Sequence, residues 1–256
     1  MKTLHKKLWR EIKDLRWQVL SMAFVVAIGI SMLVATLSSY KAMVAARADF
    51  YHISHFGDVF VFVKQAPASV LEQIRTMPGV RAAEGRIIRE VLLDLPGKTE
   101  PATGRLISLP PYGQRLNILY LRSGHMPRAM DEVVINEAFA LANRLEAGSK
   151  IFATINGRSY ELRVVGTALS PEYVFAFRGS NPMPDDAHFG VLWLAESLLA
   201  GAYNMRDTFN DLTLTLDGSR SEDSVVKALD SLLEVHGGTG AYGRLRQSSH
   251  MFLHDE

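Results

Sequence analysis

The chain has 256 residues, of which 48% are hydrophobic and none is cysteine, and its formal net charge is +1. This length suffices for one large domain or two small ones around a buried core. The apolar fraction excludes a disordered chain, and the lack of cysteine excludes disulfides, thiol catalysis and cysteine-based metal sites. The near-neutral charge argues against a dedicated nucleic-acid-binding protein.

Residues 17–40 contain no charged side chain and predict a transmembrane helix. About 20 apolar residues cross a bilayer as a helix. Trp17 and Tyr40 stand at the two ends, where amphipathic rings favour the membrane interface. The alternative is a cleaved signal peptide, whose apolar region is shorter, about 7–15 residues. We therefore expect an uncleaved anchor.

The residues around this span predict its orientation and its packing. Residues 1–16 hold six basic and two acidic side chains and are expected to form a cytoplasmic amphipathic segment, with the rest of the chain outside. That remainder has 22 basic and 25 acidic residues, so it lacks the excess of positive charge that binding to nucleic-acid phosphates needs. Small residues recur every four positions in the span, a pattern that favours close packing of another helix but is also common in single membrane helices: Ala23, Ala27, Ser31 and Ala35.

The outer part begins with strand and helix signals. Residues 38–56 contain no proline, so the membrane helix is expected to continue as a stalk that Gly57 ends. The β-branched and aromatic run 58–64 predicts a buried strand. A helix follows Pro67 and ends at Pro78-Gly79. We expect extended chain over 80–95 and a strand over 105–109.

The middle and end of the chain carry the clearest local patterns. Residues 132–135 predict a strand and 137–143 a short helix. Asn156-Gly157, between β-rich runs at 150–155 and 158–169, predicts a hairpin with a type I′ turn. Residues 170–186 are expected to form a loop. The alternating run 211–217 predicts a strand with one buried and one polar face, and a helix is expected to begin after Ser221.

The search for catalytic chemistry gives no candidate. Residues 238–243 match the dinucleotide pattern G-x-G-x-x-G, but they follow a predicted helix rather than a strand, so we expect no nucleotide site. No phosphate-binding loop, nucleophile elbow or zinc-protease helix is present. We expect no catalytic residue, cofactor or metal. Apolar side chains near the 170–186 loop predict either a partner surface or a strand packed into a core: Tyr173, Phe175, Phe177 and Met183.

Four segments together resemble FtsX-like ABC transporter permeases with an extracytoplasmic core domain of the MacB and LolC type: residues 8–18, 69–80, 131–138 and 141–148. The resemblance implies an α+β fold in which one N-terminal transmembrane helix precedes a two-part periplasmic domain. An α+β porter-like part would cover 41–111 and 188–256, and an inserted β-rich part would cover 112–187.

The resemblance also implies a function. Such permeases sit in the bacterial inner (plasma) membrane and are not enzymes. They couple ATP hydrolysis by a separate cytoplasmic ATPase to export or mechanotransmission, together with a second permease copy or homologue and, in some cases, a periplasmic partner protein. They carry three further membrane helices after the outer domain, and this sequence reaches Glu256 without a second apolar run, so we expect a truncated permease.

Two other classes of protein stay open. A single-span periplasmic adaptor or ligand-sensing protein would need no further helices, although it should carry a cytoplasmic output domain. A membrane-anchored hydrolase would need a nucleophile beside a base, and the sequence shows no such pair.

Overall fold

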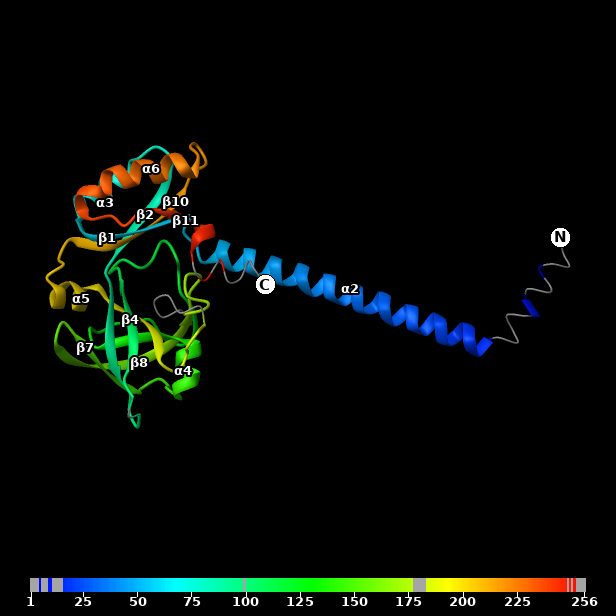
Figure 1. Cartoon of the computed structure of the whole chain (residues 1–256). Coiled ribbons are helices and arrows are strands. Elements are labelled where there is room, and N and C mark those ends of the chain that lie inside the picture. Colours follow the sequence, from blue (N-terminus) through cyan, green and yellow to red (C-terminus); the bar gives the residue numbers. More distant parts are fainter. Residues whose placement is uncertain are drawn as a thin grey trace. The chain divides into compact units, whose positions relative to one another are not determined.

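Figure 1 shows the computed structural model, which describes residues 5, 9–10, 16–98, 100–176, 183–247, 249 and 251. It contains two compact units, Met1–Phe50 and Tyr51–Glu256. Most of the expected cytoplasmic segment 1–16 lies outside the described residues.

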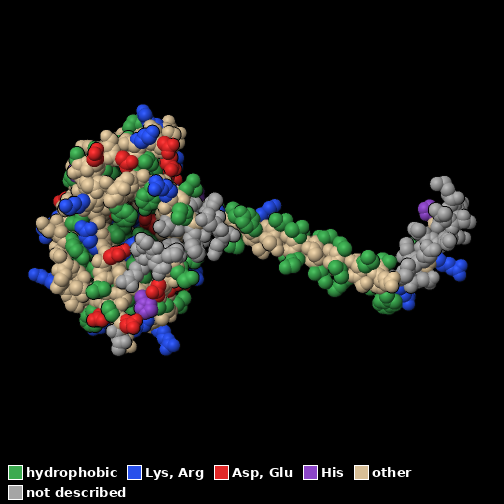
Figure 2. Space-filling model, in the orientation of Figure 1, with side chains coloured by type: hydrophobic (Ala, Val, Ile, Leu, Met, Phe, Trp, Pro, Cys, Tyr) green, Lys and Arg blue, Asp and Glu red, His purple; other side chains and the backbone are tan. Residues whose placement is uncertain are grey.

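Helix α2 (Arg16–Ile53) is 38 residues long and includes the whole expected span 17–40. None of its residues is fully buried, and Figure 2 shows hydrophobic side chains along its length. Among the described residues, it is the one helix long and apolar enough to cross a membrane, judged by length and composition. Its end at Ile53 agrees with a stalk that stops before Gly57.

The unit Tyr51–Glu256 contains a four-stranded sheet covered by two helices. The sheet has the order β11-β1-β10-β2, with β1 (Val59–Pro67), β2 (Val80–Arg86), β10 (Thr208–Leu216) and β11 (Tyr242–Gly243). Helices α3 (Ala68–Arg75) and α6 (Glu222–Leu233) lie on one face, where Ile74 and Leu229 pack onto Leu212 and Leu214 (Figure 1). All strand pairs in this sheet are antiparallel.

A second sheet of seven strands closes on itself. Its order is β5-β8-β6-β9-β4-β3-β7, and β7 also pairs with β8, so six strands form a barrel with β5 attached at its rim. The strands are β3 (Ile88–Asp94), β4 (Ala102–Leu109), β5 (Tyr120–Gly124), β6 (Glu132–Asn136), β7 (Lys150–Ile155), β8 (Arg158–Leu169) and β9 (Phe189–Ala195). Closure is possible because the first half of β8 pairs with β7 and its second half with β6 and β5.

The barrel strands have two buried faces. All six closing strands contribute to one apolar cluster, which therefore fills the interior, together with side chains of α4 (Glu137–Asn143) and α5 (Glu196–Tyr203). A second cluster lies on the outer face of the strands and is built around Trp193, Phe189 and Ile107. Strand β9 alternates between the two clusters, which is why it reads as an unbroken apolar run in the sequence.

Several local predictions are confirmed. The Asn156-Gly157 hairpin joins β7 and β8, and both turn residues have positive φ, 46° and 76°. Helix α4 has the expected bounds. Helix α6 begins directly after Ser221, although the Ser221 hydroxyl makes no capping bond and its carbonyl accepts from Ser224 N and Val225 N instead.

The expected division of the outer domain does not follow the two sheets. Strands β3 and β4, in 41–111, and β9, in 188–256, pair with the strands of 112–187 in the barrel. The reason is that strand pairing is non-local: β3 begins two residues after β2 but joins the other sheet. A porter-like part based on the four-stranded sheet and a β-rich part based on the barrel stay a proposal with these revised strands.

Candidate functional site

The four-stranded sheet has a polar face opposite its two helices. On β10, Leu212 and Leu214 point into the helix-covered core, so Asp211 and Thr213 point to the other side. Cross-strand pairing places Arg86 opposite Asp211 and Glu84 opposite Thr213. All four of these polar side chains are at most 6% exposed. The sequence predicts the alternation of β10 correctly, but both faces are buried at these positions.

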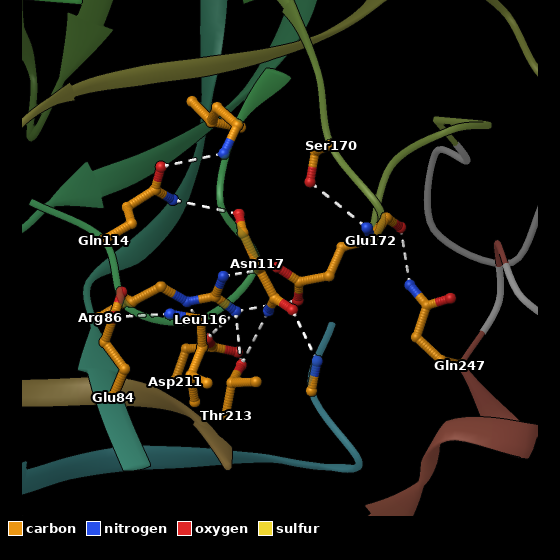
Figure 3. A network of polar contacts seen from close by, with 12 residues as sticks. Glu84, Arg86, Gln114, Leu116, Asn117, Ser170, Glu172, Asp211, Thr213 and Gln247 are labelled. Atoms are coloured by element: carbon orange, nitrogen blue, oxygen red, sulfur yellow. Dashed lines mark hydrogen bonds and ion pairs between the residues drawn. The ribbon is translucent and has the colours of Figure 1, made fainter. Parts of the chain in front are cut away.

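Arg86 binds two carboxylates at the centre of this face, as Figure 3 shows. Its Nε donates to Asp211 Oδ1 at 2.8 Å and its Nη2 donates to Glu172 Oε1 at 2.9 Å. Further bonds join Nη1 to Glu172 Oε2, Nη2 to Asp211 Oδ1, and Nη2 to Thr213 Oγ1. One guanidinium therefore holds two carboxylates in a nearly fully buried site, and the ionised triad has a net charge of −1.

Burial and neighbouring charges shift the pKa values of both Asp211 and Arg86. Burial and, as a smaller contribution, the charge of Glu172 together raise the pKa of Asp211 to about 6, against the opposing effect of Arg86. Burial alone would lower the pKa of Arg86, but Asp211 and Glu172 more than offset this and raise it well above its usual value. Arg86 therefore stays charged, and the perturbed acid beside it is Asp211.

The irregular segment 114–119 lies against this face and takes backbone hydrogen-bond partners from it. Glu84 Oε2 accepts from Arg115 N at 2.8 Å and from Leu116 N at 3.3 Å. The Asn117 side chain donates to Thr213 Oγ1 at 3.4 Å and accepts from Gly57 N at 2.9 Å. These bonds fix the 114–119 segment between β2, β10 and the residues that follow α2.

The residues that directly follow α2 are bonded to the same place. Asn117 N donates to His55 O at 3.1 Å, and Ile118 N donates to Ser54 O at 2.7 Å. Arg244, in the short helix η2 (Arg244–Arg246), donates to Phe56 O at 2.8 Å and to Asp58 Oδ1 at 2.6 Å. Its guanidinium also lies over the ring of Phe56, 5.0 Å from the ring centroid.

The C-terminal segment reaches the loop that carries Glu172. Gln247 Nε2 donates to Glu172 O at 2.7 Å, and Phe175 N donates to Ser249 Oγ at 3.3 Å. Four segments thus meet on the polar face of β2 and β10: 51–58, 114–119, 170–176 and 244–249. We call this meeting point the junction.

The structure places the predicted site residues in different environments. Ala23, Ala27, Ser31 and Ala35 are exposed on α2, and their role in helix packing stays a prediction. Tyr173 is buried against Trp193 and beneath Arg105, which is the core alternative. Phe175 is half-buried and Met183 is 73% exposed, and a partner surface there also stays a prediction. Phe177 lies outside the described residues.

Sequence reasoning missed the junction entirely. Its charged members, Arg86, Glu172, Asp211 and Arg244, lie far apart in the chain and match no motif. The one signal available was an arginine and an aspartate inside predicted strands, where an ionised side chain needs a buried partner. In the part of the chain that the structure describes, no group of three His, Asp or Glu side chains is arranged to hold a metal ion.

The fold is similar to two solved extracytoplasmic transporter domains. The periplasmic region of MacB from Actinobacillus actinomycetemcomitans is 12% identical, with a TM-score of 0.47 over 80% of this chain and 95% of the other. The extracellular domain of the noncanonic ABC-type transporter YknZ from Gram-positive bacteria is 10% identical, with a TM-score of 0.47 over 73% and 98%. No family model and no curated protein matches the sequence. At these identities the likeness concerns the fold alone. The helices and strands of the structure itself confirm the expected α+β fold with an N-terminal apolar helix.

Proposed function

We propose that the chain supplies the first membrane helix and the periplasmic core domain of an ABC transporter permease in a bacterial inner (plasma) membrane, with its N-terminus in the cytoplasm. In this proposal a separate cytoplasmic ATPase hydrolyses ATP, and the permease passes the resulting motion outward for export or mechanotransmission. The observation that carries the proposal is the junction, because it bonds the residues that directly follow the candidate membrane helix to the C-terminal segment and, through Asn117, to the four-stranded sheet.

The length of α2 supports a mechanical role. A helix of 38 residues is roughly 57 Å long, whereas the hydrocarbon core of a bilayer is about 30 Å thick. More than a dozen residues therefore extend beyond the span as helix, and no proline interrupts them. Because the backbone hydrogen bonds of a helix are internal, a displacement of the span reaches the last turn without local refolding.

The junction offers a route for that displacement. Arg244 and β11 lie against the residues that follow α2, since Val59 pairs with Gly243 and Arg244 binds Asp58. From there, Asn117 contacts the four-stranded sheet, and Gln247 contacts the loop of Glu172. A pull on either end of the domain therefore reaches the same buried residues.

The partners in this proposal follow from the same features. The ridge of small residues on α2 would pack against further membrane helices of the permease or of a second copy. The exposed side chain of Met183 marks the candidate surface for a periplasmic partner protein. A single-span adaptor remains the alternative function, and it predicts no ATPase partner.

The test is to isolate the complete gene product, with an affinity tag, from membranes of its source bacterium. The proposal predicts that one ABC ATPase copurifies in stoichiometric amount and that Arg244→Ala changes its ATP hydrolysis rate at least twofold. Arg158→Ala is the matched control, because Arg158 is exposed in the β7–β8 hairpin, and it should leave the rate unchanged. Recovery of the tagged protein without any ABC ATPase would support the adaptor and overturn the proposal.

A further inference from the structure

The triad in the junction has one cation for two anions. Arg86, Asp211 and Glu172 are 2%, 3% and 6% exposed at their side chains. A buried charge without a partner is costly, and a carboxyl group usually avoids that cost by taking up a proton. The two carboxylates share a single guanidinium, so protonation of either one leaves a neutral 1:1 ion pair.

The geometry indicates which carboxylate takes the proton. Arg86 holds both oxygens of Glu172 in a bidentate pair, whereas all of its bonds with Asp211 go to Oδ1. Bidentate pairs are the stronger ones. Oδ2 of Asp211 makes no bond with Arg86 and can accept a proton from solvent without breaking the Arg86–Glu172 pair. Burial also raises the pKa of Asp211 to about 6, in the same direction as this argument.

Other titratable groups face Asp211 from the surrounding elements: Arg86 of β2, Arg105 of β4, Glu172 and Tyr173 of the 170–176 loop, and Tyr242 of β11. Arg105 is bonded to Glu90 at 2.6 Å, so its charge is already balanced. Burial raises the pKa of both tyrosines above its ordinary value, and they stay neutral in acidic and neutral solution. The excess negative charge thus belongs to Asp211 and Glu172.

We propose that Asp211 and Glu172 compete for Arg86, and that protonation of Asp211 under mildly acidic conditions strengthens the Arg86–Glu172 pair and tightens the 170–176 loop onto the four-stranded sheet. Arg86 and Asp211 are neighbours within one sheet, so the bond that weakens lies inside the sheet. The bond that strengthens joins the sheet to the loop that Gln247 also holds. The junction is in this way an acid-strengthened latch, and this inference is independent of the transport function.

The test is hydrogen exchange of the 170–176 loop, followed by mass spectrometry on the full chain in lipid nanodiscs at pH 7.5 and pH 5.0. Rates are corrected for intrinsic chemical exchange at each pH. The latch predicts about tenfold greater protection of the loop at pH 5.0. An interaction of about one pK unit between two carboxylates means that protonation of Asp211 changes the equilibrium of the Arg86–Glu172 pair about tenfold, and the loop opens only when that pair breaks. Equal protection of the wild-type loop at the two pH values would overturn the proposal without any variant.

Three variants identify the group that titrates. Asp211→Asn should give the acid level of protection at both pH values, and Glu172→Gln should give low protection at both. Asp94→Asn, at an exposed position on β3, is the matched control and should keep the wild-type pH response. If Asp211→Asn keeps that response as well, another group titrates and the proposal is wrong.

Discussion

Replacement of Arg86 by methionine is the sharpest test of the buried triad. Methionine has a similar length and leaves little empty space, so the change removes charge and hydrogen bonds rather than volume. It leaves Asp211 and Glu172, both almost fully buried, without their shared cation. Breaking a buried ion pair from one side costs about 3–5 kcal/mol, and we expect Arg86→Met to lower the free energy of unfolding by this amount at pH 7.5.

The measurement is urea unfolding of the full chain in mild detergent, followed by the fluorescence of Trp193. This side chain is buried in the outer-face cluster of the barrel, and Trp9→Phe and Trp17→Phe make it the only tryptophan. With a urea dependence of about 2–3 kcal/mol per molar for a domain of this size, the midpoint should fall by roughly 1–2 M.

A matched variant separates lost charge pairing from lost packing. In the triple variant Arg86→Met, Glu172→Gln, Asp211→Asn, no buried charge is left unpaired, so most of the lost stability should return. A fall of less than about 1 kcal/mol in the single variant would refute the reasoning. So would a triple variant no more stable than the single one, since the loss would then come from packing.

Three further predictions concern the ends and turns of the domain. Arg244→Ala should cost about 1–3 kcal/mol and speed hydrogen exchange in residues 56–58, because it removes charged donors from two backbone carbonyls and a carboxylate. Gly157→Ala should lower the free energy of unfolding in urea by about 1 kcal/mol, because alanine is strained at this positive φ although its Cβ would meet no neighbour. Gly124→Ala should lower it by more, because the position also has a positive φ and the new Cβ would lie 2.0 Å from Val165 O. Since the chain has no cysteine, a membrane-impermeant maleimide applied to intact cells should label Tyr112→Cys, which is 96% exposed, but not Lys6→Cys, and the reverse pattern would invert the proposed topology.

Structural elements that depend only on residues close together in the chain could be predicted from the sequence. The Asn156-Gly157 turn forms because both residues adopt positive φ easily, and the strands on either side then pair in register. Helix α6 begins after Ser221 and ends before Gly237, which has a φ of 72°. The apolar span could be predicted for the same reason, since its signal is continuous over residues 17–40.

The barrel could not be read in this way, because its closure depends on pairs far apart in the chain. Strand β4 pairs in parallel with β9, and Thr103 lies opposite Phe189. Strand β3 pairs with β7, and three other strands lie between them in the chain. Periodicity shows that a segment is extended, but it does not show which partner it takes. The expected boundaries at 111 and 188 therefore cut through one sheet.

The junction could not be predicted from the sequence because the polar face on which it forms is covered by other segments. Alternation along β10 correctly predicts a polar face, and a polar face ordinarily means solvent. Here the 114–119 and 170–176 segments cover it instead, and their backbone groups cannot all pair with one another.

A sheet face covered by irregular segments has to supply their hydrogen-bond partners from its own side chains. Glu84 accepts hydrogen bonds from two backbone amides of the 114–119 segment, and the side chain of Asn117 accepts one from the backbone amide of Gly57. An apolar face at these positions would leave those buried amides without acceptors, at about 1–3 kcal/mol each. The triad differs, because Arg86 serves side chains and not backbone, so an apolar replacement of all three members would orphan no amide. A stable fold therefore needs Glu84 and Asn117 at this face but not the charges of Arg86, Asp211 and Glu172, and that difference favours a role for the triad in how the junction responds to protons and force.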